Sequence, residues 1–379
     1  MASCVRTGKE RRMAFVTIRD VAREAGVSIA AVSQILHDKG KFSDETRRIV
    51  LQAVDKLGYV PDRRASTMRS SETKTIGLLV PNLRNPYFAD LVAAMEDSLY
   101  ARGYTPLIGS SAESVVRQDE FITNLLGQRI DGAIMVPQGV DSPGIRSLTR
   151  RGLPLVFVDR QIPGVGDVPF IVSDPYPGIR SAVESLVGLG HRRVGFVAHP
   201  ALGAFSVDER GETFERIAGE LLPGGGVVMS CDSTYGSRRD ALMRLYDLGV
   251  SAIVCAYSLD AITMVGLLHD MSVEIGRDMS LVSFDDIEAF RLMTPSIAVI
   301  SQQADVMGLR GVDMLLSVTP GGRAGDWASC KGVWPHEEGE REGDASSDSA
   351  IGGGSHDIHH VPTVYVPRRS VGPAPVAVG

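Results

Sequence analysis

Carboxylates stand at the ends of three short apolar runs. Asp159 closes LVFVD, Asp174 closes FIVSD, and Asp285 with Asp286 closes SLVSFDD. Ligands of open parallel sheets bind beyond the carboxyl ends of the strands, and carboxylates are strong hydrogen-bond acceptors for hydroxyl groups. The three ends therefore indicate a site for a hydroxyl-rich small molecule. The residues leave an alternative open, in which each Asp caps the helix that follows it.

The amino-terminal part of the chain carries a second candidate site. Residues 17–58 have the caps and the apolar spacing of three short helices, with Gly26 and Gly58 ending the first and the third. The expected caps are Thr17, Ser28 and Ser43. The expected inward residues are Ile18, Val21, Ala22, Ala25, Val32, Ile35, Leu36, Ile49, Val50, Ala53, Val54 and Leu57. The spacing predicts a small all-α unit with a tight turn between its first two helices.

The turn gives the second helix a chemical role. In a helix-turn-helix this helix lies in the major groove of DNA, and the outward residues at its amino end reach base edges. Here the outward residues are Ser28, Ile29, Ala30, Ser33 and Gln34. Gln34 can pair with adenine, and the small Ala30 permits close approach to bases. A three-helix bundle that binds no nucleic acid is the alternative.

Charge is divided unevenly along the chain. Residues 1–75 hold 15 Lys and Arg against 9 Asp and Glu, a net charge of +6, whereas the remainder holds 24 against 37, a net charge of −13. A basic head on an acidic body is typical of a polyanion-binding module attached to a domain that does not bind nucleic acid. The four cysteines are scattered without zinc-ligand spacing, so we expect neither a metal site nor a cofactor.

The remainder of the chain alternates short buried strands with helical segments from Thr75 onward. This alternation predicts an α/β fold with parallel sheets covered on both faces. The segment lacks the glycine-rich and nucleophile-elbow motifs of doubly wound enzymes, so we do not expect an enzyme. Neither an export signal nor an apolar run long enough to span a bilayer is present, which predicts a cytoplasmic protein with no membrane partner.

Several motifs at fixed separations carry a family resemblance. They are D-V-A-x-x-A-G-V-S from Asp20, V-S-x-I-L from Val32, S-x-E-T-R from Ser43, G-Y-x-P from Gly58, T-I-G-L-L-V-P from Thr75, N-P-Y-F from Asn85, G-H-R-R-V-G-F-V from Gly190 and S-F-D-D-I from Ser283. Together they resemble the LacI/GalR (lactose repressor) family of transcriptional regulators, over residues 16–318 and the terminal strand. The resemblance implies a homodimer that binds double-stranded operator DNA and is controlled by a small-molecule effector, a sugar or sugar derivative.

The resemblance also implies a domain plan. A helix-turn-helix head over 16–61 and a hinge helix over 62–74 precede a two-lobed, periplasmic-binding-protein-like core over 75–370. We expect lobe 1 to hold 75–160 and 291–319, and lobe 2 to hold 161–290 and 361–370. The chain is then expected to cross between the lobes near 159–163, near 290–295 and from 319 onward.

Two segments fall outside the family pattern. We expect residues 1–15 to form a flexible extension, with Met13 as the true start, and the low-complexity segment 320–360 to be a disordered insertion. His356, His359 and His360 beside that insertion are expected to be solvated rather than to bind a metal.

The family pattern implies the DNA contacts. Two hinge segments order on DNA and insert an apolar side chain into the minor groove, and Met68 occupies the position of that residue. The implied contact residues are Thr17, Ser28, Ile29, Ala30, Ala31, Ser33, Gln34, His37, Arg63, Ala65, Met68 and Arg69. Ala31 and Gln34 stand where Thr and Arg are usual, and His37 where Asn is common. These departures predict a divergent operator sequence or a weaker affinity.

The same resemblance assigns effector contacts. Tyr87 and Phe88 match aromatic walls of the site, Arg210 a clamping arginine, and Asp159 and Asp285 polar anchors. Tyr257 and Ser258 stand where the family usually has Asn-Asp, which removes a common sugar anchor and adds an aromatic surface. Two alternatives stay open. One is a sugar-binding receptor, which has no use for the helical head, and the other is a regulator controlled by a protein partner.

Overall fold

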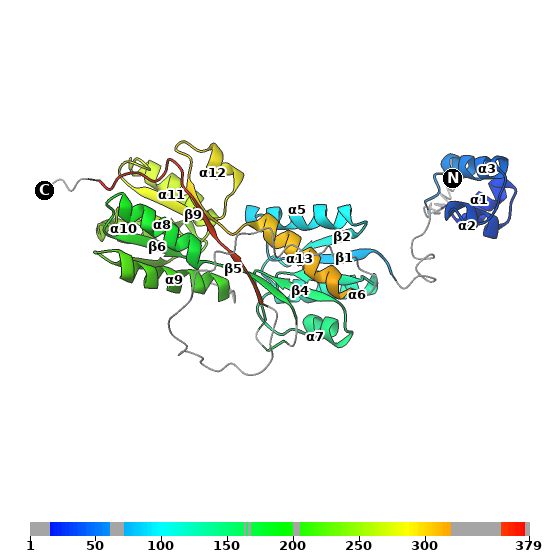
Figure 1. The fold of residues 1–379 in the computed structure, drawn as a ribbon, viewed down its shortest axis with the longest axis horizontal. Coiled ribbons are helices and arrows are strands. Elements are labelled where there is room, and N and C mark those ends of the chain that lie inside the picture. The colour runs from blue at the N-terminus through cyan, green and yellow to red at the C-terminus, as the bar shows by residue number, and fades with distance from the viewer. Residues whose placement is uncertain are drawn as a thin grey trace, which may run out of the picture. The chain divides into compact units, whose positions relative to one another are not determined.

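The computed structural model describes residues 16–60, 72–162, 164–165, 168–199, 205–319 and 358–375. The chain divides into two compact units, Met1–Thr73 and Lys74–Gly379 (Figure 1). The expected extension over 1–15 and nearly all of the expected hinge and insertion lie outside the described residues. No described helix has the length and apolar character needed to span a membrane.

The first unit, the head, is the predicted all-α domain. It consists of α1 (Ile18–Ala25), α2 (Ile29–Leu36) and α3 (Asp44–Leu57). Ser28 and Ser43 cap α2 and α3, accepting hydrogen bonds from the backbone N–H groups of Ala31 and Thr46. Gly26 ends α1 with φ 64°, a left-handed conformation that glycine adopts without steric cost. Because only three residues separate α1 from α2, the two helices form the predicted helix-turn-helix.

The core of the head is small and matches the expected stripes with one exception. Its buried side chains are Val21, Ala22, Val32, Ile35, Val50 and Ala53. Ile49 was expected to point inward, and this prediction was wrong, because its side chain is 37% exposed. Val50 and Ala53 already occupy the inward face of α3, and a residue one position earlier lies about 100° around the helix from Val50.

The second unit, the body, contains two six-stranded sheets. The first sheet has the order β11-β5-β4-β3-β1-β2, and every pair in it is parallel. Its strands are β1 (Thr75–Val80), β2 (Thr105–Ser110), β3 (Gly132–Met135), β4 (Leu155–Val158), β5 (Phe170–Asp174) and β11 (Ile358–Pro362).

The second sheet repeats the plan in the order β12-β10-β9-β8-β6-β7. Its strands are β6 (Val194–Ala198), β7 (Gly226–Ser230), β8 (Ala252–Cys255), β9 (Ser280–Phe284), β10 (Ala298–Ser301) and β12 (Val364–Val366). All pairs are parallel except the edge pair of β10 with β12, which is antiparallel. The predicted α/β fold with parallel sheets is thus confirmed.

Helices cover both faces of each sheet, as the alternating pattern predicts (Figure 1). On the first sheet, α5 (Pro86–Ala101) and α13 (Ala304–Val318) bury one face while α6 (Val115–Gly127) and α7 (Pro143–Arg150) bury the other. On the second sheet, α8 (Tyr176–Gly188) and α9 (Phe205–Leu221) lie opposite α10 (Tyr235–Asp247) and α11 (Ser258–Asp270). A short helix, α12 (Glu288–Leu292), follows β9.

The chain crosses between the two lobes at places other than those expected. Strand β5, assigned by sequence to lobe 2, pairs with β4 in the first sheet, so the first crossing is at Pro175. Strand β10, assigned to lobe 1, pairs with β9 in the second sheet, and the second crossing is at 302–303. The carboxyl-terminal segment forms one strand in each sheet and crosses at Thr363. The pairing of each strand with its neighbours decides these boundaries. The composition of a segment does not show which strands it pairs with.

Hydrogen bonds join the three crossing segments to one another. Ser173 at the end of β5 donates its hydroxyl to the side-chain oxygen of Gln302 over 2.7 Å. The side chain of Gln303 donates to the carbonyl of Pro362 over 2.7 Å. Thr363 is buried, and its Oγ1 accepts from the N–H of Gly178 and donates to the carbonyl of Asp174.

We predict that Thr363→Val lowers the free energy of unfolding by about 1–3 kcal/mol, because it leaves the N–H of Gly178 buried without its acceptor. Thr363→Ser keeps the hydroxyl and loses one methyl group, so its cost is about 1 kcal/mol or less. Urea denaturation of both variants measures the difference. Equal stability of the two variants would show that the hydroxyl contributes nothing at this crossing.

Candidate functional site

The amino end of α2 presents uncharged side chains on the surface of the head. Ser28, Ile29, Ala30 and Gln34 are exposed and Ser33 is half-buried, whereas Val32 and Ile35 on the opposite face lie in the core. The predicted outward and inward residues of this helix are therefore in the places expected. The exposed row is free of carboxylates, which permits approach to DNA phosphates.

Other DNA-contact candidates of the head have local roles as well. Thr17 is exposed before α1, and its N–H and hydroxyl both donate to the carboxylate of Asp20. Ala31 is half-buried behind the cap, and His37 is exposed at the end of α2 with Nδ1 2.7 Å from the carbonyl of Ser33. Four further candidates, Arg63, Ala65, Met68 and Arg69, lie outside the described residues.

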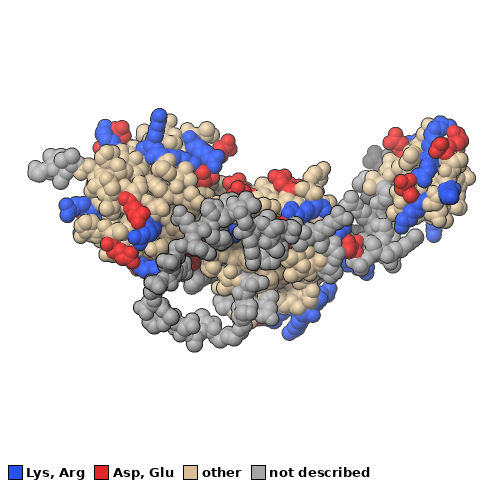
Figure 2. All heavy atoms as spheres, viewed as in Figure 1, with Lys and Arg blue, Asp and Glu red and all other residues tan. Residues whose placement is uncertain are grey.

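The basic side chains of the head are partly engaged in surface ion pairs. These are Arg23 with Asp20, Arg47 with Asp38, Arg48 with Glu45, and Lys56 with Glu24. On the face of the head visible in Figure 2, Lys and Arg lie beside Asp and Glu. Exposed pairs of this kind contribute about 0–1 kcal/mol each, so such cations remain available for phosphate contacts.

In the body, polar side chains from both lobes meet in a buried group, which we call the interlobe cluster. Its members are Tyr87, Asp159, Arg210, Asp285 and Gln302. Tyr87 and Asp159 belong to the first sheet and its helices, Arg210 and Asp285 to the second, and Gln302 lies at the second crossing. All five are less than about a tenth exposed.

The two carboxylates of the cluster occupy equivalent places in the two lobes. Asp159 follows β4 and Asp285 follows β9, and both residues have left-handed backbone conformations, with φ 64° and 68°. Aspartate tolerates this region better than most residues, and such conformations concentrate at functional sites. Asp174 behaves differently, because its carboxylate accepts from the N–H of Tyr176 and so caps α8. For Asp174 the capping alternative is the one observed.

Gln302 connects the two lobes through hydrogen bonds. Its Oε1 accepts from Ser173 over 2.7 Å and from Nη2 of Arg210 over 2.6 Å. Its Nε2 donates to Oδ1 of Asp285 over 2.5 Å. Arg210 also donates through Nη1 to the carbonyl of Ala256, and its guanidinium lies over the ring of Phe284, 4.5 Å from the centroid. The arginine is therefore held rigidly from several sides.

Burial controls the protonation of the cluster. It raises the pKa of Asp285 to about 6, against the opposing effects of Arg210 and the hydrogen bond from Gln302. It likewise raises the pKa of Asp159, which Arg160 and Arg210 partly counteract. The pKa of Tyr87 is raised well above its usual value by burial and by the charge of Asp159, so its hydroxyl stays protonated and donates to Asp159 over 3.3 Å.

Aromatic side chains flank the cluster. Phe88 packs edge-on against Tyr87, and Arg160 lies 5.8 Å from the centroid of its ring. Tyr257 is half-buried, and burial raises its pKa to about 12, with further contributions from Asp260, Asp285 and Glu113. Because Glu113 belongs to the first lobe, Tyr257 lies near both lobes. The six predicted effector residues thus converge on one region.

Several buried polar atoms of this region have no hydrogen-bond partner among the described residues. They are Nε of Arg160, Nε of Arg210 and Oγ of Ser258. An unsatisfied buried polar group costs about 1–3 kcal/mol, and such groups in native proteins call for an explanation. A ligand that offers acceptors and donors at these atoms would remove the cost.

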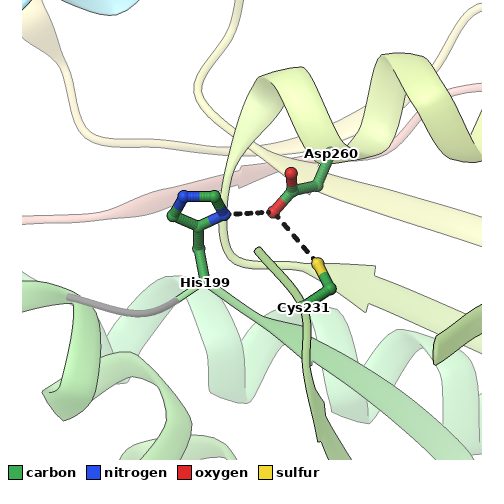
Figure 3. Close-up of side chains that lie close together, drawn as sticks. All are labelled: His199, Cys231 and Asp260. Carbon is green, nitrogen blue, oxygen red and sulfur yellow. Dashed lines mark hydrogen bonds and ion pairs between the residues drawn. The ribbon is translucent and has the colours of Figure 1, made fainter. Parts of the chain in front are cut away.

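A second polar group lies at the carboxyl edge of the second sheet. His199 follows β6, Cys231 follows β7, and Asp260 lies in the first turn of α11 (Figure 3). Their ligand-type atoms all lie within 4.8 Å of one another. The ring of His199 packs against Tyr257 with centroids 4.8 Å apart, which places this group beside the interlobe cluster.

Comparisons with known proteins find a match for the head and a match for the body. Residues 17–62 match the model of bacterial regulatory proteins of the lacI family, and residues 183–326 match that of a periplasmic-binding-protein-like domain. The ribose operon repressor of Bacillus subtilis (strain 168) is 28% identical over 310 residues, which cover 80% of this chain and 92% of the relative. The chain therefore combines a lacI-family helix-turn-helix head with a periplasmic-binding-protein-like domain.

Solved structures of LacI-family proteins share the fold. The lac repressor dimer bound to operator and the anti-inducer ONPF matches with a TM-score of 0.72 and 23% identity, covering 94% of this chain and 99% of that chain. A LacI-family regulator from Enterococcus faecium with bound ribose matches with a TM-score of 0.61 and 20% identity, covering 79% and 99%. The predicted helix-turn-helix head and two-lobed core are confirmed by these likenesses.

The interlobe region also contains residues that the sequence did not reveal. Gln302, Arg160 and Glu113 join the predicted set, and Arg160 forms an ion pair with Glu113 at 2.8 Å. Gln302 follows β10, whose AVIS run was not recognised as a strand. Recognising that run would have placed Gln302 at a strand end and marked it as a candidate.

We predict that Asp285→Asn gains stability relative to the parent protein as the pH rises from about 4 to 6. The unfolded chain ionises this carboxyl near its usual pKa and the folded chain only near 6, so ionisation lowers the free energy of unfolding of the parent across that window. The difference reaches on the order of 1–3 kcal/mol and is constant above about pH 7. Urea denaturation of both proteins across this range measures it.

The adjacent Asp286→Asn serves as a control of opposite sign. Burial opposes ionisation of Asp286, but its hydrogen bonds from Arg291 and Arg368 and the charges of these two arginines outweigh burial and lower its pKa. The stabilisation by Asp286 is therefore present above the unfolded pKa and is lost as the pH falls. The stability deficit of Asp286→Asn should therefore shrink on acidification. The same pH trend in both variants would contradict the assignment.

Proposed function

We propose that this chain is a sequence-specific DNA-binding transcriptional regulator that acts as a repressor and responds to a carbohydrate effector. One observation carries the proposal: a helix-turn-helix with an exposed, uncharged recognition row is joined to a two-lobed body in which buried polar side chains from both lobes converge. A sugar receptor of the transport type would have no use for the head.

The exposed row of α2 supports direct readout of bases. Gln34 offers a donor and an acceptor that match the major-groove edge of adenine, and Ala30 leaves room for a thymine methyl group. Ala31 and Gln34 replace a Thr and an Arg that the family usually carries, so the preferred operator differs from those of relatives. Phosphate contacts would come from the head's lysines and arginines, which makes binding salt-dependent.

A homodimer is part of the proposal. One helix-turn-helix reads a half-site of only a few base pairs, and two copies related by twofold symmetry read an inverted repeat. The lac repressor, whose fold this chain shares, is a dimer on its operator. Met68 is assigned the role of the minor-groove wedge on the basis of its position in the family pattern.

The chemistry of the interlobe region favours a polyhydroxyl ligand. Asp159 and Asp285 can accept hydrogen bonds from hydroxyl groups. Nε of Arg160 and Nε of Arg210, which make no hydrogen bond among the described residues, can donate to hydroxyl or ring oxygens. Tyr87, Phe88 and Tyr257 supply apolar surface for the faces of a sugar ring. Relatives include a ribose operon repressor and a structure with bound ribose, which makes ribose the first sugar to examine.

Regulation follows from the position of Gln302. A ligand that takes over the hydrogen bonds of Arg210 or Asp285 weakens their contacts with Gln302 and so changes the relative orientation of the lobes. Altered lobe orientation in a dimer changes the spacing of the two DNA-binding heads. A tenfold change in operator affinity requires about 1.4 kcal/mol of coupling, roughly the worth of one such hydrogen bond.

We predict that selection from random duplex DNA with the full chain enriches an inverted repeat. Gln34→Ala should lower affinity for that sequence by about 1–3 kcal/mol and relax the preference at one base pair of each half-site. Gln52→Ala is the matched control, since Gln52 is exposed on α3 rather than on α2. Fluorescence anisotropy at fixed salt measures both. Equal binding of selected and random fragments would refute sequence-specific recognition.

We predict that Arg210→Ala abolishes binding of a sugar effector and also changes ligand-free operator affinity, because it removes one of the hydrogen bonds by which Gln302 links the lobes. Calorimetry with D-ribose, a hexose and a disaccharide measures the first effect. Arg216→Ala on the exposed side of α9 is the control. If none of the sugars binds the parent protein, the carbohydrate assignment fails and control by a protein partner becomes the better hypothesis.

A further inference from the structure

The group formed by His199, Cys231 and Asp260 has no part in the proposed regulatory function. The three residues lie far apart in the sequence and come together because β6, β7 and β8 are neighbours whose carboxyl ends share one edge (Figure 3). Asp260 is fully buried, Cys231 is 2% exposed, and the side chain of His199 is 14% exposed.

The distances within the group suit a tetrahedral metal ion. Nδ1 of His199 is 3.0 Å from Oδ2 of Asp260, and Sγ of Cys231 is 3.7 Å from the same oxygen. A tetrahedral zinc ion separates a nitrogen and an oxygen ligand by about 3.3 Å, and a sulfur and an oxygen ligand by about 3.5 Å. Shifts of a few tenths of an ångström bring the two edges to Asp260 to zinc-ligand spacing. The third edge, between His199 and Cys231, is at most 4.8 Å and has to close to about 3.5 Å.

Neighbouring residues orient the ligand atoms. Arg238 donates from Nε to Oδ1 of Asp260 over 2.7 Å, which leaves Oδ2 directed toward His199 and Cys231. Ser233 lies 3.4 Å from Nε2 of His199 and can accept the proton of that nitrogen, so that Nδ1 presents its lone pair. Ligand histidines commonly hold the proton on the second ring nitrogen in this way, and ligand carboxylates are themselves hydrogen-bonded.

The charges of the side chains around the group balance one another. The guanidinium of Arg238 is the one positive charge that contacts Asp260 among the described residues, and Asp260 neutralises it. Asp232, which is next to Cys231, supplies a further negative charge near Arg238 and His199. With a doubly charged metal ion and a thiolate in place, these side chains leave the site close to neutral.

We propose that His199, Cys231 and Asp260 form a binding site for a zinc ion, with water as the fourth ligand. Thiolate, imidazole and carboxylate together select a borderline-soft divalent cation, and three protein ligands leave one position open. On binding, the Cys231 thiol releases one proton to solvent and the proton of His199 Nδ1 moves to Nε2, so the ion is coordinated by a thiolate and a neutral imidazole.

The competing arrangement is a purely hydrogen-bonded cluster. Without a metal ion, Asp260 accepts hydrogen bonds from Arg238, from His199 and from the Cys231 thiol, so both of its carboxylate oxygens have partners. The two arrangements differ in what the sulfur does. In the hydrogen-bonded cluster the sulfur is a thiol and gives no charge-transfer band. In the metal site the sulfur is a thiolate bound to the metal ion, and with cobalt it gives such a band.

Cobalt(II) titration of the full-length protein tests the proposal. Cys4→Ser and Cys330→Ser are introduced first, so that Cys231 and Cys255 are the remaining thiols. We expect one equivalent of cobalt to give the visible bands of a tetrahedral ion and a near-ultraviolet band from thiolate-to-cobalt charge transfer. Zinc should displace the cobalt and remove both features. Absence of the charge-transfer band at stoichiometric cobalt would overturn the proposal.

Two cysteine variants test which thiol produces the charge-transfer band. Cys231→Ala should remove the charge-transfer band and weaken zinc binding by more than about 100-fold, since loss of an outer-shell contact alone weakens metal binding by about 10- to 100-fold. Cys255→Ala, which changes a buried thiol outside the group, should keep the band. Circular dichroism confirms that both variants fold. Persistence of the band in Cys231→Ala would overturn the assignment.

X-ray absorption of the zinc-loaded parent protein tests the same site without substitutions. We expect one sulfur at about 2.3 Å and nitrogen or oxygen ligands at about 2.0 Å. A shell of nitrogen and oxygen alone would instead indicate binding by surface groups such as His359 and His360, and would refute the site. Neither experiment uses DNA or a sugar, so its failure is distinguishable from failure of the proposed regulatory function.

Discussion

The hydrogen bonds of Gln302 are the interaction on which the body of this protein depends. The residue lies where the chain passes from the second sheet to α13, and it contacts Ser173 at the first crossing together with Arg210 and Asp285 of the second lobe. Because all four side chains are buried, each bond is made in a low-dielectric setting where losing a partner is costly. The amide of Gln302 thereby links the two lobes, and any ligand that competes for its partners acts on the orientation of the lobes.

Burial imposes a second constraint on the same region. It brings the carboxylates of Asp159 and Asp285 together with the guanidinium of Arg210, and it raises the pKa of both acids despite that cation. Ionising these buried carboxyl groups therefore costs free energy, which other interactions of the folded lobes offset. A polyhydroxyl ligand that donates to these carboxylates would reduce the cost without adding charge, which is the physical basis for assigning a sugar-like effector.

The proposed zinc site adjoins this region through Tyr257, whose ring packs on His199 and whose pKa responds to charges from both lobes. A metal ion there would fix the carboxyl ends of β6 and β7 and the start of α11 as one rigid edge. Tyr257 would then contact its ligand from a more rigid position, because its ring packs on His199. Tyr257 stands where the family resemblance places a sugar anchor, and the histidine that packs against it belongs to a separate polar group.

The sequence by itself determined most of the elements and placed the candidate contact residues at helix starts and strand ends. Local signals suffice for this, since caps, helical spacing and strand-end aspartates depend on neighbours within a few positions, as at Ser28, Ser43, Asp159 and Asp285. Tertiary structure alone decided the lobe boundaries, because β5, β10 and β11 take their sheet from pairing partners distant in the chain. It also decided that Asp174 is a cap, that Gln302 links the lobes, and that His199, Cys231 and Asp260 meet. Such contacts arise from strand order, which residue spacing does not encode.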